Sequence, residues 1–493
     1  NINIFSSTLD QNIANQSGGI MYVKTRSYMH LVRNTTITNN KALYRDGGGF
    51  YNLAIYNIEL TKIHKNSARE NGGFVYVEMM YENKLRIIQS SFQSNIAKTK
   101  SGGVMMIHNV LPDGLFVDIE GTHYVENKAG MSGGMMQING SNLRFSVLNS
   151  TLKENTASNG DGGCIFGRSD ITMDIQNTNI VSNQAGKNGG CMSFGDDTNI
   201  NISSCILDKN IANQSGGIMY MKTRSYMHLV RNTTITNNKA IYRDGGGFYN
   251  LAIYNIVSTT IHNNSARENG GFLYVNMMYE NKLRIIQSSF RNNIAKTKSG
   301  GVMIIHNVLP DGLFVDIEGT QYVQNQAGMS GGMMQINGSN LRFSVLNSTL
   351  KENTASNGDG GCIFGRSDIT MDIQNTNIVS NQAGKNGGCM SFGDDTNINI
   401  SSCILDKNIA NQSGGALRVE NNMVLGISNL IVKHNIAREG YGGVFSSGNQ
   451  FILYSKNIAF VGNAATERNG GCISGSSNGF VSFDNVSFTS NSA

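Results

Sequence analysis

The stretch TLKENTASNGDGGCIF, from Thr151 to Phe166, contains two signals that recur along the chain. The first is an apolar residue followed three places later by Asn and five places later by Ala, here Leu152, Asn155 and Ala157. The second is a Gly-Gly pair that precedes a short apolar run. Apolar runs bounded by small polar residues and glycine predict β-strands joined by tight turns.

The Asn signal recurs with a short period of about 28 residues, and seven occurrences fill one longer unit. Repeats of this length are typical of solenoids, in which each repeat is one coil. The asparagines of this signal are Asn12, Asn40, Asn66, Asn95, Asn127, Asn155, Asn183, Asn210, Asn238, Asn264, Asn293, Asn325, Asn353, Asn381, Asn408, Asn435, Asn463 and Asn491.

A longer repeat of 198 residues contains the short one. Residues 1–198 and 199–396 differ at 18 positions, and residues 129–198 match 327–396 without a change. Residues 397–493 are a partial third unit that diverges after Gly415. The sequence therefore predicts two seven-coil units and a diverged half unit in one continuous solenoid.

A right-handed parallel β-helix of about 18 coils is the predicted fold. The runs are rich in Ile, Val, Phe, Tyr and Thr, and no helical periodicity is sustained. A single coil cannot bury its apolar face, so successive coils must stack with equivalent strands in parallel. Right-handed connections are strongly preferred between parallel strands. At equivalent positions the repeated asparagines would form a hydrogen-bonded ladder.

Other repeat folds fit less well. Leucine-rich repeats have a similar period but require a Leu-x-x-Leu-x-Leu frame, which is missing here. WD40 and kelch blades need longer repeats of about 40 to 50 residues.

The composition argues against several partners. A net charge of +5 is mild for 493 residues, and the basic residues are scattered, so we expect no nucleic-acid binding. No window approaches the ~20 apolar residues needed to span a bilayer, so we expect no membrane span in this region.

Asn-x-Ser/Thr sequons indicate an extracellular or cell-surface glycoprotein that carries N-linked glycans. The candidate glycosylation sites are Asn15, Asn34, Asn139, Asn149, Asn201, Asn213, Asn232, Asn263, Asn337, Asn347, Asn399, Asn411 and Asn485.

Four of the seven cysteines are placed to form cross-coil disulfides. They directly follow Gly-Gly, so one period separates Cys164 from Cys191 and Cys362 from Cys389. Equivalent positions on stacked strands lie about 5 Å apart, within the Cα range of a disulfide. The alternative is a column of small apolar thiols. Cys472 has no such neighbour, and we interpret Cys205 and Cys403 as buried substitutes for Ser.

No catalytic residue, metal ligand or cofactor is predicted. A polysaccharide-cleaving β-helix needs a cluster of carboxylates or basic residues on one face, yet no acidic pair stands out in both copies. Glu59, Glu78 and Glu126 become Val257, Asn276 and Gln324 in the second copy. Neither the RTX nor the EF-hand calcium pattern occurs. Turn formation is therefore favoured over metal binding for Asp161, Asp196 and Asp197.

The paired motifs resemble the repeats of the chlamydial polymorphic membrane proteins and related right-handed β-helix surface proteins. FQSNIAKTKSGGVM (Phe92 to Met105) and FVGNAATERNGGCI (Phe460 to Ile473) carry the resemblance, and the pattern covers the whole chain. In this chain the apolar residue is more often Ile or Leu than Phe. The resemblance implies a β-helix and a location outside the cell.

These patterns favour a non-enzymatic extracellular structural protein, a β-helical rod that forms or decorates a surface filament or coat. Its expected partner is itself, through end-to-end or lateral self-association into filaments. An adhesin that binds host or neighbouring-cell ligands is the alternative, and a polysaccharide lyase or hydrolase is the third hypothesis.

Overall fold

The structure, a computed structural model, describes residues 2–24, 27–475 and 478–493. The chain divides into two compact units, Asn1–Leu251 and Ala252–Ala493. We call them unit 1 and unit 2 and describe each by itself. This boundary does not fall at either end of a 198-residue repeat.

Each coil contributes strands to three parallel sheets, which we call A, B and C. In the coil that begins at Leu143, sheet A holds β22 (Leu143–Leu148) and β23 (Thr151–Lys153). Sheet B holds β24 (Thr156–Ala157), and sheet C holds β25 (Ile165–Gly167). The quoted stretch therefore spans three of the four strands of one coil.

Stacking of the coils confirms the predicted parallel β-helix. β22 pairs in parallel with β18 (Leu115–Glu120) and β26 (Ile171–Gln176), each 28 residues away. Sheet B has one strand per coil, which gives nine coils in unit 1 and eight in unit 2 over the described ranges. The predicted number was about 18; one further coil begins with β69 (Phe480–Thr489) in sheet A, and its sheet B part is a single bridge, Ala464 to Ser492.

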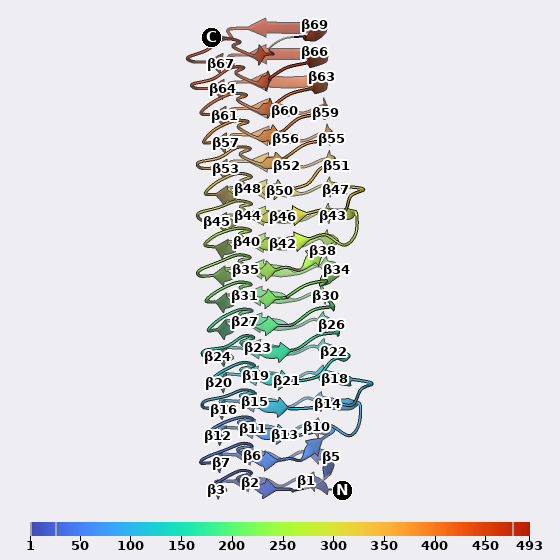
Figure 1. The fold of residues 1–493 in the computed structure, drawn as a ribbon, viewed down its shortest axis with the longest axis vertical. Helices are drawn as coiled ribbons and strands as arrows, with labels where there is room; N and C mark the ends of the chain where they lie inside the picture. The colour runs from blue at the N-terminus through green and yellow to red at the C-terminus, as the bar shows by residue number, and fades with distance from the viewer. Residues whose placement is uncertain (1, 25–26, 476–477) are drawn as a thin grey trace. The chain divides into compact units, whose positions relative to one another are not determined.

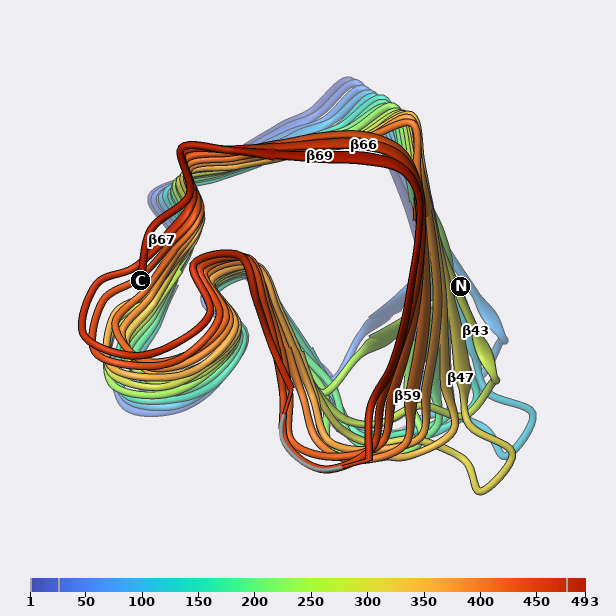
Figure 2. The same ribbon diagram turned by 90° about the horizontal axis from the view of Figure 1, so that it is seen from above.

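The coils of each unit are right-handed. Within a unit, equivalent strands lie directly above one another (Figure 1). Seen from above in Figure 2, the chain runs counter-clockwise from sheet A through sheet B to sheet C while it rises towards the viewer. The described residues of both units form strands, turns and bends without any helix.

The first and last coils define each unit's bounds. Unit 1 starts with β1 (Ile2–Phe5), β2 (Thr8–Asp10) and β3 (Ile13–Ala14), and its last sheet A and B strands are β34 (Tyr226–Arg231), β35 (Thr234–Thr236) and β36 (Lys239–Ala240). Unit 2 starts with β38 (Ala252–Ile253), β39 (Asn255–Val257) and β40 (Thr260–His262), and it ends with β66 (Phe451–Val461), β67 (Ala464–Ala465), β68 (Ile473–Ser474) and β69 (Phe480–Thr489).

Sheet C carries the site described below. In unit 1 its strands are β4 (Met21–Tyr22), β8 (Phe50–Tyr51), β13 (Val75–Val77), β17 (Met105–Ile107), β21 (Met136–Ile138), β25, β29 (Met192–Ser193), β33 (Met219–Tyr220) and β37 (Phe248–Tyr249). In unit 2 they are β42 (Leu273–Met277), β46 (Met303–Asn307), β50 (Met334–Ile336), β54 (Ile363–Gly365), β58 (Met390–Phe392), β62 (Leu417–Val419), β65 (Phe445–Ser447) and β68.

Four residues with left-handed backbone bend the coil of β22. They are Asn149 (φ 49°), Glu154 (φ 55°), Gly162 (φ 65°) and Asp170 (φ 54°). The second glycine of the pair meets a different requirement, because a Cβ on Gly163 would lie 2.0 Å from the carbonyl oxygen of Gly190 in the next coil. The Gly-Gly pair therefore combines a left-handed turn with close contact between coils.

The interior of each coil is apolar because alternate residues of every strand point inward. Leu143, Phe145 and Val147 of β22 are at most 3% exposed. Aromatic rings also stack from coil to coil in the core, as Phe92 and Tyr124 do with centroids 4.6 Å apart. Each unit thus has one continuous core along its stacked coils.

The predicted asparagine ladder is confirmed. Asn155 donates from Nδ2 to Oδ1 of Asn183 at 3.1 Å and to the carbonyl of Tyr124 at 2.9 Å. Its own Oδ1 accepts from the amide nitrogen and Nδ2 of Asn127. The same bonds connect Asn12 to Asn238 in unit 1 and Asn264 to Asn491 in unit 2. From Asn40 to Asn463 each ladder asparagine is completely buried, with its amide satisfied.

Candidate functional site

Two further polar columns run parallel to the asparagine ladder in each unit. One lies at the corner of sheet A, where the hydroxyls of Ser90, Thr122 and Ser150 each accept a bond from the backbone of the preceding coil. Cys205 and Cys403 occupy this column and donate to the carbonyls of Ser203 and Ser401, as their interpretation as Ser substitutes requires.

The other column consists of the residues just before each Gly-Gly pair. Asp161 belongs to it: its Oδ1 accepts two 3.0 Å hydrogen bonds, from the amide nitrogen and Nδ2 of Asn188. Its own amide nitrogen donates to Oγ of Ser132. Asp161 is therefore a structural turn residue, and Asp359 makes the same bonds to Asn386 in unit 2.

The outward side chains of sheet C form a column rich in aromatic residues. In unit 1 the column is Tyr22, Tyr51, Tyr76, Met106, Gln137, Phe166, Ser193, Tyr220 and Tyr249. In unit 2 it is Tyr274, Ile304, Gln335, Phe364, Ser391, Arg418, Ser446 and Ser474. The rings of Tyr22 and Tyr51 stack with centroids 4.8 Å apart, and those of Tyr51 and Tyr76 with centroids 5.3 Å apart.

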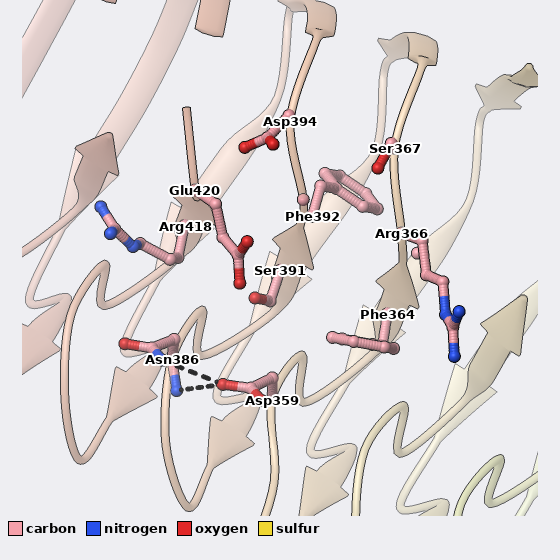
Figure 3. Close-up of a pocket in the computed structure, with 12 residues that line it drawn as sticks. Asp359, Phe364, Arg366, Ser367, Asn386, Ser391, Phe392, Asp394, Arg418 and Glu420 are labelled. Carbon is pink, nitrogen blue, oxygen red and sulfur yellow. Dashed lines mark hydrogen bonds between the residues drawn. The ribbon is translucent and has the colours of Figure 1, made fainter. Parts of the chain in front are cut away.

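A pocket opens where this column contains a serine next to a phenylalanine, and it occurs once in each unit. We call it the groove pocket; its volume is about 510 Å³ in unit 1 and about 350 Å³ in unit 2. In unit 1 it is lined by Asp161, Phe166, Gly167, Arg168, Ser169, Asn188, Ser193, Phe194, Gly195, Asp196, Tyr220 and Lys222. In unit 2 it is lined by Asp359, Phe364, Gly365, Arg366, Ser367, Asn386, Ser391, Phe392, Gly393, Asp394, Arg418 and Glu420 (Figure 3).

Gly167 lies at the floor of this pocket, where its lack of a side chain matters. A Cβ on Gly167 would lie 3.1 Å from the ring of Phe194 and 2.8 Å from the side chain of Ile171. The missing side chain leaves room for the Phe194 ring, which is 2% exposed and stacks on Phe145 inside the coil. The backbone at the pocket is thereby fixed from the core side.

A serine hydroxyl at the centre of the pocket has no partner. Ser193 and Ser391 are 3% and 5% exposed, and neither hydroxyl makes a hydrogen bond within the parts of the chain that the structure describes. In Figure 3 Ser391 lies between Phe364 and Glu420, and its hydroxyl is directed to the side of Glu420 and Asn386. Neither hydroxyl oxygen is among the fully buried side-chain atoms without a partner, so both are open to the pocket and available to a ligand.

The two pockets share most side chains and differ at one edge. Tyr220 and Lys222 of unit 1 are replaced by Arg418 and Glu420 in unit 2. Burial lowers the pKa of Arg418, against the raising effect of Glu420, and Arg418 donates to Ser446 at 3.0 Å. The shared residues include two carboxylates, one guanidinium and two phenyl rings, of which Phe166 and its equivalent Phe364 lie in the outward column.

A metal centre is not indicated at these residues. Over residues 2–24, 27–475 and 478–493, no group of three or more His, Cys, Asp or Glu side chains is arranged to hold a metal ion. Asp196 accepts a hydrogen bond from Thr223, and Asp197 forms an ion pair of 2.7 Å with Arg224. The Asp196 and Asp197 carboxylates therefore interact with side chains of the next coil.

The candidate disulfide cysteines lie in contact. The Sγ atoms of Cys164 and Cys191 are 2.8 Å apart, those of Cys362 and Cys389 are 2.9 Å apart, and all four residues are completely buried. All seven cysteines are free thiols in the structure. The two disulfides therefore stay a prediction, although the two cysteines of each pair are adjacent.

The candidate glycosylation sites all keep some exposure. Asn34, Asn149, Asn232 and Asn347 lie exposed at the left-handed corner of sheet A, with φ near 50°. Asn139, Asn201, Asn213, Asn337 and Asn411 are half-buried. Occupancy of any site by a glycan remains a prediction.

Sequence reasoning missed the groove pocket. Its signal is visible in unit 1 when the runs after Gly-Gly are aligned, since Ser193 is a small polar residue in a column that unit 1 otherwise fills with Tyr, Phe, Met or Gln. That alignment does not show that Asp161 and Arg168 border the same space.

Comparisons with known proteins gave no relative. No protein-family model matches the chain, and no curated protein matches it. Among the described residues, no helix is long and apolar enough to cross a membrane.

Proposed function

We propose that the chain is a non-enzymatic, N-glycosylated structural protein of the cell exterior, which self-associates end to end or laterally into a surface filament or coat. The resemblance of its repeats to those of chlamydial polymorphic membrane proteins supports a surface location. Those proteins share the paired Asn and Gly-Gly signals, and we propose that this chain uses them for the same architecture.

The observation that carries the proposal is the unbroken asparagine ladder of each unit. Each coil from that of Asn40 to that of Asn463 contributes one completely buried asparagine amide, and hydrogen bonds join these amides from coil to coil within each unit. An asparagine ladder of this kind stabilises every coil to a similar extent and favours no single local site. A structural protein that acts as a rod or spacer requires this uniform stability.

The replacements between the two copies support the same role. Of the 18 positions, all but four lie at the surface, and none is a ladder asparagine. The four buried replacements keep small or apolar side chains: Ser7 to Cys205, Val23 to Met221, Val75 to Leu273 and, in the outward column of sheet C, Met106 to Ile304. The copies thus share the interior that holds the coils together.

Electron microscopy and sedimentation of the chain, secreted from a eukaryotic host, test this proposal. We expect filaments or ordered assemblies whose share of the material rises with protein concentration. Monodisperse particles at every concentration would refute self-association. Digestion with an N-glycosidase should lower the mass of the secreted chain, and an unchanged mass would refute the glycoprotein assignment.

An adhesin is the second candidate, and the aromatic column of sheet C favours it. Tyr22 is 53% exposed although its ring stacks on Tyr51, and such rings are common in contact surfaces. Saturable binding of the purified chain to cells would support this role, and binding that never saturates would oppose it.

A further inference from the structure

We propose that the groove pocket of each unit binds a neutral hexose unit of a glycan. The proposal goes beyond the structural role and does not depend on self-association. It rests on a pocket with the same core residues in both units, an unpartnered serine hydroxyl that is open to the pocket, a phenyl ring and flanking carboxylates.

The phenyl ring supplies an apolar platform. Phe166 and Phe364 are partly exposed, lie in the outward column and border the pocket serine of the next coil. A pyranose has one face of C–H groups, which packs favourably on an aromatic ring and leaves the hydroxyls at its edge. The ring therefore accounts for the apolar part of such a ligand.

The polar groups suit the hydroxyls at that edge. Ser193 can donate and accept one hydrogen bond each, and no protein partner competes for it. Asp161 uses only Oδ1 for its bonds to Asn188, which leaves the other carboxylate oxygen as an acceptor. Hydrogen bonds from hydroxyls to a charged carboxylate are stronger than those between neutral groups.

The charges favour a neutral ligand over an anionic one. In unit 1, the two negative charges of Asp161 and Asp196 equal in number the two positive charges of Arg168 and Lys222. In unit 2, three carboxylates face two guanidinium groups. In Figure 3 the Glu420 and Asp359 carboxylates lie on the side of the Ser391 hydroxyl, whereas the Arg366 and Arg418 side chains extend away from it. An anionic sugar would thus meet carboxylates at the centre of the unit 2 pocket.

The volumes are consistent with this assignment. At about 350 and 510 Å³, both pockets lie within the ~300 to 1,000 Å³ that is typical of small-ligand sites. The pocket lies along the stacked coils, so a linear glycan could extend beyond it over neighbouring members of the outward column.

Titration calorimetry of the whole chain, with neutral tetrasaccharides of glucose, mannose or galactose and with tetragalacturonate as the anionic comparison, tests the proposal. We expect at least one neutral probe to bind at two sites per chain, and tetragalacturonate to bind at least tenfold more weakly. The absence of binding by every neutral probe up to about 5 mM, or a preference for tetragalacturonate, would overturn it.

Three variants locate the binding. Phe166→Ala should remove one of the two sites, and F166A/F364A should weaken binding at least tenfold. Ser193→Val keeps the aromatic ring and fills the pocket with methyl groups, so it should also remove one site. The control is Y44A/Y242A, which removes two exposed rings that do not line the pocket and should bind like the parent. Equal binding by parent, pocket variants and control would refute the location.

Discussion

The Sγ atoms of Cys164 and Cys191 lie 2.8 Å apart in the core of unit 1, on consecutive coils. Because the pair is adjacent, we expect it to oxidise to a disulfide during secretion, as we expect for Cys362 and Cys389. Burial, followed by the hydrogen bond with Cys191, raises the pKa of the Cys164 thiol well above its usual range, so native thiols should resist alkylation.

Alkylation in denaturant, followed by intact mass measurement, checks this. Without reductant we expect three of the seven cysteines to be modified, and with reductant all seven. Cys164→Ser should release Cys191 and raise the number without reductant by one. Modification of all seven without reductant would show a column of thiols instead.

Removing one ladder amide should destabilise several coils. Asn155→Ala removes the Oδ1 that accepts from the backbone nitrogen and Nδ2 of Asn127. It also removes the Nδ2 that donates to the carbonyl of Tyr124. Unsatisfied buried groups cost about 1–3 kcal/mol each, so we expect a loss of roughly 3 kcal/mol in local stability. Hydrogen exchange of the neighbouring coils measures it, since stability in a solenoid is local. Asn179→Ala, at an exposed position of β27 (Asn179–Val181), is the matched control, and equal protection in the two variants would contradict the ladder's role.

Removing the Tyr124 hydroxyl should stabilise the protein. This hydroxyl is buried in the apolar core without a hydrogen bond, and burial raises the pKa of Tyr124 far above its usual value. Tyr124→Phe keeps the stacking on Phe92 and removes the unpaired group, so we expect a gain of about 1 kcal/mol. Tyr322 is the equivalent residue in unit 2. Urea unfolding followed by fluorescence measures the change. Tyr44→Phe, at an exposed tyrosine, should leave stability unchanged, and a lower midpoint for Tyr124→Phe would contradict the prediction.

Two histidines should make the fold sensitive to mild acid. Burial, and then the charges of Lys62 and Lys65, lower the pKa of His64 below its usual value near 6.5. Burial, and then Arg291, lower that of His262. Around pH 6 these two histidines therefore bind protons more readily in the unfolded chain than in the folded one. The folded state is favoured above the histidine pKa of the unfolded chain, and this stability is lost as the pH falls below it.

Urea midpoints between about pH 7.5 and pH 5.5 test this sign. H64Q/H262Q should lose less stability over the range than the parent, because Gln does not titrate. A parent whose midpoint rises on acidification, or a variant with the same slope, would contradict the prediction.

The asparagine ladder and the groove pocket differ in how far sequence could predict them. The ladder follows from the repeat itself, since a residue found at the same place in every coil must stack on its own equivalents. The pocket depends instead on a departure from the repeat, Ser193, and on residues from three consecutive coils, such as Asp161, Arg168 and Lys222.

The corner residues show the same division. The sequence predicted that the Gly-Gly pairs turn the chain, and Gly162 does so with a φ of 65°. It did not predict that Asn149 and Glu154 also take left-handed backbone, because Glu has no intrinsic preference for it. Only the stacking of the coils on both sides imposes that conformation.

The sequence by itself determined the coil period, the parallel stacking, the asparagine ladder and the adjacency of Cys164 and Cys191, because all four follow from residues that recur at a fixed spacing. Only the tertiary structure decided which side chains of neighbouring coils share a space outside sheet C. It placed Phe166 beside Ser193, left the serine hydroxyl without a partner and set Asp161 at its edge. These relationships depend on side-chain direction and on close packing, and a one-dimensional repeat does not specify either.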